Sequence, residues 1–75
     1  MLNPVRKHVF LVTIYNKAVR AMVKENRSHA FYSDLWADAH VQDIDADTEA
    51  EARAIAKHRY PPKDGFVIES IVAAP

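Results

Sequence analysis

The chain has 75 residues with no cysteine, a single glycine and a formal net charge of zero, which excludes a disulfide framework, a zinc-type Cys/His cluster and a glycine-rich phosphate loop. The longest apolar run, over 9–15, is far shorter than the roughly 20 residues of a membrane span and lacks a small-residue cleavage site after it, so we expect a soluble, cytoplasmic protein without a membrane segment or cofactor. A domain this small buries only about 60% of the surface of its unfolded chain, and self-association is the remaining source of added stability.

The first predicted element is a strand over 8–15, HVFLVTIY, because β-branched and aromatic residues dominate it. Apolar residues occupy both of its alternating faces: Val9, Leu11 and Tyr15 on one, and Phe10, Val12 and Ile14 on the other. A strand with this pattern is normally central in its sheet and covered on both sides.

The next segment, over 16–26, is predicted as a short helix that Asn16 caps. Val19, Met22 and Val23 would share its apolar face at helical spacing. A β-hairpin is the alternative, because apolar and basic residues also alternate here. The abundance of Ala, Met, Lys and Glu favours the helix.

Residues 26–35 are predicted as a loop that leads into a second strand within 36–46. The apolar residues of 36–46 change parity along the segment, which a bulge or a late start of the strand would explain.

A helix is predicted over 48–59, where Thr48 and Glu51 form a capping box. In such a box the hydroxyl bonds the third helical amide, and the carboxylate returns to the amide of the threonine. The stripe that would face the sheet is narrow and mostly small: Ala52, Ile55 and Ala56.

The segment KHRYPPKDGFVIESI ends this helix and starts the last strand. Tyr60 precedes two prolines, which exclude the helical region for it, and Gly65 supplies the positive φ of a turn. A strand over 66–72 follows, and it is again apolar on both faces.

The whole chain, 1–75, is therefore predicted to be one small α+β domain. Its three-stranded sheet would span about 8–15, 36–46 and 66–72, with helices at 48–59 and 16–26. If 16–26 is not helical, the order of elements becomes β-β-α-β or β-β-β-α-β.

Charge is segregated along the chain, because residues 34–51 contain seven acidic residues and no basic one. If 16–26 is helical, basic residues fall in one arc beside its apolar face: Lys17, Arg20, Lys24 and Arg27. Such a basic stripe can contact phosphates of nucleic acid, or it can be a solvated helix face, which the zero net charge favours.

Aromatic residues concentrate in the segment HAFYSDLW, which contains Phe31, Tyr32 and Trp36. Aromatic residues in a loop can form a protein-interface hot spot or a base-stacking platform. More often they fix the loop onto the core.

No catalytic residues are predicted, since the histidines are scattered and no serine lies in a nucleophile-elbow context. An enzyme is the less favoured alternative, in which Asp38, His40 and Asp43 would converge with Ser33 or Tyr32. A divalent-cation site would use Asp43, Asp45 and His40, but a solvated acidic strand end is the favoured interpretation of the aspartates. An EF-hand is excluded, because its required glycine and final glutamate are replaced by Thr48 and Ala54.

These features favour a small non-catalytic interaction module, accessory or regulatory in role, that acts as a homodimer or on a protein partner. The alternative is a nucleic-acid-binding protein that uses the basic stripe. If the helices pack on one side of the sheet, one apolar parity of the first strand stays exposed, and a two-fold dimer would bury it.

Overall fold

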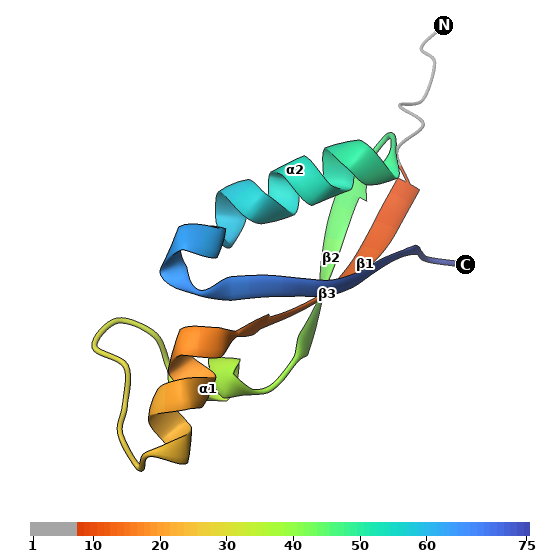
Figure 1. The fold of residues 1–75 in the computed structure, drawn as a ribbon. Helices are drawn as coiled ribbons and strands as arrows, with labels where there is room; N and C mark the ends of the chain where they lie inside the picture. Colours follow the sequence, from red (N-terminus) through yellow and green to blue (C-terminus); the bar gives the residue numbers. More distant parts are fainter. Residues whose placement is uncertain (1–7) are drawn as a thin grey trace, which may run out of the picture.

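The structure is a computed structural model that describes residues 8–75. It contains a three-stranded antiparallel sheet in the order β2-β1-β3, with two α-helices and two 3-10 turns (Figure 1). Along the chain the elements are β1 (His8–Asn16), α1 (Lys17–Lys24), a 3-10 turn (Asp34–Ala37), β2 (His40–Ala46), α2 (Glu49–Arg59), a second 3-10 turn (Pro62–Asp64) and β3 (Phe66–Ala73). The predicted α+β fold is confirmed.

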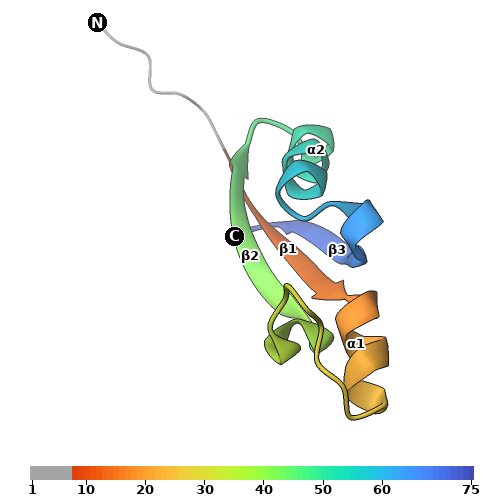
Figure 2. The same cartoon turned by 90° about the vertical axis from the view of Figure 1, so that its left-hand side faces the viewer.

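β1 is the central strand, as its apolar pattern predicted. Its even-numbered residues form the inner face of the sheet, which α2 covers through Ala52 and Ala56, both fully buried (Figure 2). The small alanines let the backbone of α2 approach the sheet closely. Val12 and Ile14 on this face are completely shielded from solvent.

β3 contains a bulge that changes the parity of its apolar residues. Thr13 pairs with Ser70 whereas Ile14 pairs with Ile68, so Glu69 is the extra residue. Ile68 and Ile71 therefore both pack against the core, although they lie an odd number of residues apart.

α2 begins as predicted, with the Thr48 hydroxyl accepting a hydrogen bond from the amide of Glu51 at 3.1 Å. The reciprocal bond differs from the expected capping box, because the Glu51 carboxylate accepts from the amide of Asp47, one residue earlier than Thr48. The helix ends before Tyr60, whose position ahead of two prolines excludes a further turn.

The segment after β1 is helical, so the hairpin alternative and the layouts without this helix are wrong. The Asn16 side chain accepts hydrogen bonds from the amides of Ala18 and Val19, at 2.9 and 3.0 Å. α1 ends at Lys24, and Asn26 beyond it adopts a positive φ of 57°. An asparagine cap that satisfies two amides at once stabilises this short helix at its start.

The second strand starts at His40 rather than at 36. Ser33 caps a 3-10 turn by accepting from the amide of Leu35, and the carbonyl oxygen of Ser33 accepts from the amide of Trp36. The late start of the strand explains the change of parity seen in the sequence.

Gly65 has the left-handed conformation predicted for it, with φ of 100°. Its carbonyl oxygen accepts from the amide of Lys17, so the turn before β3 is tied to the start of α1. An added Cβ would lie 2.6 Å from Asn16 Oδ1 and 2.9 Å from the Cβ of Ala18, which makes the approach too close for any other residue.

Candidate functional site

The face of the sheet opposite α2 is the main candidate surface, and we call it the open face. The strand register assigns to it the residues that alternate with the core: Val9, Leu11, Thr13, Tyr15, Val41, Asp43, Asp45, Val67, Ser70 and Val72. In Figure 2, α2 lies on one side of the sheet and α1 continues beyond the end of β1, so neither helix of the described chain covers the open face.

The apolar residues of the open face are accessible to solvent. Val9 is 40% exposed, Val41 58% and Val72 53%, whereas Leu11 and Tyr15 are half-buried by their neighbours. These side chains come from all three strands: Leu11 pairs with Val72 across the sheet, whereas Val9 pairs with Asp45 and Val41 pairs with Thr13. Exposed apolar side chains gathered on one face typically mark an interaction site, and we call this group the apolar strip.

Arg20 lies at one end of the open face. Its guanidinium carbon is 3.7 Å from the centroid of the Tyr15 ring, and its Nε donates a hydrogen bond of 2.7 Å to the carbonyl oxygen of Ala37. These contacts fix the side chain of Arg20 against the sheet.

The other members of the basic stripe are placed differently from Arg20. Arg27 lies beyond the end of α1 and forms an exposed ion pair of 3.5 Å with Glu25. Lys17 and Lys24 are exposed at the two ends of α1. The stripe is therefore not one uniform cationic surface.

The predicted aromatic residues separate into two groups. Tyr32 and Trp36 pack edge-on against Phe66, with ring centroids 5.1 and 5.2 Å from it, and Trp36 also contacts Tyr60. They fix the loop after α1 onto the inner face of the sheet. Phe31, in contrast, is 87% exposed.

The residues of the conceivable metal site lie on opposite faces of β2. Asp43 and Asp45 belong to the open face, whereas His40 pairs with Ile14 and its Nε2 lies 2.7 Å from the carbonyl oxygen of Leu35. Among residues 8–75 no group of three acidic, histidine or cysteine side chains is arranged to hold a metal ion.

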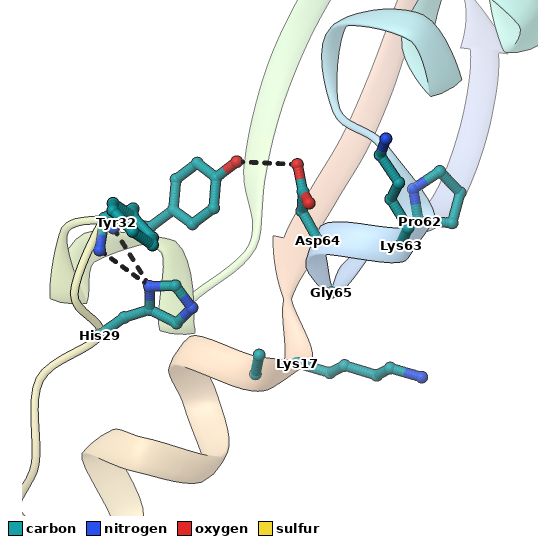
Figure 3. A pocket seen from close by; sticks show the side chains of 9 residues that line it. Lys17, His29, Tyr32, Pro62, Lys63, Asp64 and Gly65 are labelled. Atoms are coloured by element: carbon teal, nitrogen blue, oxygen red, sulfur yellow. Dashed lines mark hydrogen bonds between the residues drawn. The ribbon is translucent and has the colours of Figure 1, made fainter.

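A pocket of about 710 Å³ lies where α1, the turn before β3 and the loop over 26–35 meet (Figure 3); we call this loop, which carries Phe31 and Tyr32, the aromatic loop. Tyr32 donates a hydrogen bond of 3.0 Å to the Asp64 carboxylate across this pocket. His29 Nδ1 accepts from the amides of Phe31 and Tyr32, at 3.0 and 3.4 Å, which places the proton of the neutral ring on Nε2.

The polar groups of the pocket mostly hold its walls together. Asn16, fully buried, caps α1 and donates from Nδ2 to the carbonyl oxygen of Asp64 at 3.0 Å. Lys17 and Lys63 extend in different directions in Figure 3 and do not converge on a common point. The polar groups of the pocket thus serve to join α1, the loop over 26–35 and the turn before β3.

The hydrogen bond to Asp64 raises the pKa of the Tyr32 hydroxyl above its usual value. Partial loss of solvent and the negative charge of Asp64 act in the same direction. The protonated phenol is favoured because only it can donate to the carboxylate.

Sequence reasoning did not find the Asn16–Asp64 and Tyr32–Asp64 contacts. The partners are separated by 48 and 32 residues, and no local spacing signals such a pairing. A turn motif and a cap residue were each recognised, but only the fold brings them together.

Comparison with protein-family models, with curated proteins and with solved structures finds no match to this chain. No helix within residues 8–75 has the length and apolar character needed to cross a membrane.

Proposed function

We propose that this chain is a non-catalytic interaction module that associates with a second copy of itself through the open face. The observation that carries the proposal is the exposure of Val9, Val41 and Val72 on the side of the sheet that α2 leaves uncovered. The inner face of the same sheet is sealed by α2 and the aromatic cluster. Association would remove the apolar strip from water and add stability to a domain too small to bury it alone.

The size of the open face sets the expected strength of association. The strands lie about 4.8 Å apart and rise about 3.3 Å per residue, so the open face measures about 14 by 25 Å. Two copies together would bury a flat area of about 700 Å², without the extra surface of the side chains. Interfaces at this small end of the range are typical of reversible contacts rather than obligate dimers. We therefore expect a reversible dimer.

Sedimentation equilibrium over micromolar to millimolar concentrations tests the proposal. Val72→Asp should shift the protein to monomer, because it would bury a charge within an apolar contact. Ala54→Asp adds the same charge on the exposed side of α2 and should leave the association constant unchanged. A wild-type chain that stays monomeric throughout this range would refute the proposal.

A second candidate function is nucleic-acid binding, which the exposure of Phe31 favours, since Phe31 and Lys17 line the same pocket. An exposed aromatic ring can stack on a base while a cation on the same surface contacts a phosphate. Fluorescence anisotropy with single-stranded oligonucleotides at low salt tests this function. Phe31→Ala should weaken binding and Lys17→Gln/Lys24→Gln should reduce its salt dependence, whereas Leu35→Ala, a control at another exposed site, should do neither.

A further inference from the structure

The acidic residues of the open face lie near the start of β1 and on the side of β2. By the register of the sheet, Asp45 lies beside Val9, and Asp43 lies beside Leu11. Both carboxylates are exposed. This corner of the open face is therefore negative.

The positive charge of the open face lies at the other end of the same side. Arg20 stacks on Tyr15 near the end of β1, and its bond to Ala37 holds it toward the segment that precedes β2. Within residues 8–75, the Arg20 guanidinium forms its hydrogen bond through Nε and not through its two terminal nitrogens. Its terminal amino groups are available for a carboxylate from outside.

Two copies that pack face to face are related by a two-fold axis lying between the sheets. If this axis ran along the strands, β2 of one copy would cover β3 of the other. Asp43 would then be buried over the partner's Val72, at a desolvation cost that no opposite charge offsets.

If the axis runs across the strands, β2 covers the partner's β2 in the reverse direction. The acidic corner of each copy then lies over the end that carries the partner's Arg20. Asp43 lies beside Leu11 and Arg20 lies over Tyr15, and Thr13 is between these two positions on β1. A two-fold axis that passes through the level of Thr13 would therefore bring each Asp43 toward the partner's Arg20.

We propose that a second copy of this chain docks on the open face with its strands antiparallel, so that Asp43 and Asp45 of each copy meet the partner's Arg20. The arrangement rests on the proposed self-association through the open face and specifies its geometry. Arg20 is suited to the contact because Tyr15 and Ala37 already hold it in place, so little side-chain entropy is lost on binding.

Cross-linking distinguishes the two axes. Val41 and Ser70 lie on either side of Thr13 in one row across the sheet, and both are exposed. With the axis across the strands, each of them faces its own counterpart; with the axis along the strands, Val41 faces the partner's Ser70. The chain contains no cysteine, so Val41→Cys and Ser70→Cys each introduce a single thiol.

Each variant is treated with a short bis-maleimide, alone and as an equimolar mixture, with Ala54→Cys as a control on the far side. We expect covalent dimers from Val41→Cys alone and from Ser70→Cys alone, and none from the control. Product that forms only in the mixture would overturn the antiparallel arrangement and leave self-association through the open face intact. A dimer in sedimentation that cross-links at neither site, or a wild-type monomer, would overturn both.

Neutralising Asp43 and Asp45 should change the dissociation constant of the dimer in opposite directions for the two axes. In the antiparallel arrangement, Asp43→Asn/Asp45→Asn removes the partner of Arg20 and should raise the dissociation constant about tenfold. With the axis along the strands, the same change relieves buried charge and should lower the dissociation constant. Glu49→Gln, on α2, should leave it unchanged; a lowered or unchanged constant for the double variant would overturn the proposal.

Discussion

The two faces of β1 have similar apolar side chains and very different surroundings. Val12 and Ile14 on the inner face are fully buried, whereas Val9 on the open face is 40% exposed and Leu11 is half-buried. The apolar pattern of β1 thus indicates how much apolar surface the strand presents, but the pattern does not identify which element packs on each face. In this chain α2 covers one face only.

The cover of the inner face comes from two parts of the described chain. α2 presents Ala52 and Ala56, and the core residues of the sheet fill the space left by these small alanines. Beyond the end of α2, Trp36 and Tyr32 continue the cover by packing on Phe66. Both coverings belong to the inner face, and neither helix within residues 8–75 covers the open face.

The largest expected difference between the faces is in the cost of truncating a side chain. Ile14→Ala leaves a cavity in the closed core and should lower the free energy of unfolding by about 3 kcal/mol. Leu11→Ala, on the open face, should cost about 1 kcal/mol or less in the monomer, because its site is partly solvated already. Urea denaturation at low protein concentration measures both.

Equal costs for the two truncations would show that the open face is covered in solution even when the protein is dilute. Leu11→Ala should also weaken dimerisation, which sedimentation detects separately. Ile14→Val is the matched control for the inner face and should cost about 1 kcal/mol.

A smaller effect is expected at Gly65, which joins the turn before β3 to the start of α1. Gly65→Ala should destabilise the fold by about 2 kcal/mol, since a Cβ meets Asn16 and Ala18 and the positive φ is unfavourable. Thermal or urea denaturation measures the loss.

Gly65→Asn separates the two causes, because asparagine tolerates positive φ but carries the same Cβ. If the asparagine variant is as stable as the wild type, the contact with Asn16 and Ala18 is not limiting. A fully stable alanine variant would contradict both causes.

The sequence predicted the elements better than their assembly. The strand at β1, the caps Asn16 and Thr48 and the left-handed Gly65 are set by local chemistry, and each occurs as expected. The start of β2 was left open between a bulge and a late start, and the late start is what occurs, because the cap at Ser33 places a 3-10 turn before the strand.

The candidate surface depended on information that the sequence lacks. The sequence does not decide whether the odd- or the even-numbered residues of β1 are exposed, because it does not show on which side of the sheet α2 packs. The position of Arg20 over Tyr15 joins two elements whose mutual angle no local pattern defines. The bulge at Glu69 likewise decides which residues of β3 reach the open face.

The cover of the inner face also depends on how α2 starts. Thr48→Ala removes the side-chain acceptor of the Glu51 amide and should lower the free energy of unfolding by about 1 kcal/mol. Thr48→Ser keeps the hydroxyl and should cost much less. If alanine and serine behave alike in thermal melts, the Glu51 carboxylate alone stabilises the helix start through its bond to Asp47.

The smallest effect concerns Tyr32, whose hydrogen bond to Asp64 secures the aromatic loop on the inner face. Because the pKa of Tyr32 is raised in the folded chain, its contribution to stability is fully present below the unfolded pKa of about 10 and is lost as the pH rises through the folded value. The melting temperature of the wild type should therefore exceed that of Tyr32→Phe by a constant margin up to about pH 9, and the margin should shrink above pH 10. Asp64→Asn removes the carboxylate that raises the pKa, so Tyr32→Phe made in that background should show a smaller change of margin with pH. A margin that grows at high pH would mean that the phenolate, and not the phenol, is favoured at this site, and would refute the assigned bond to Asp64.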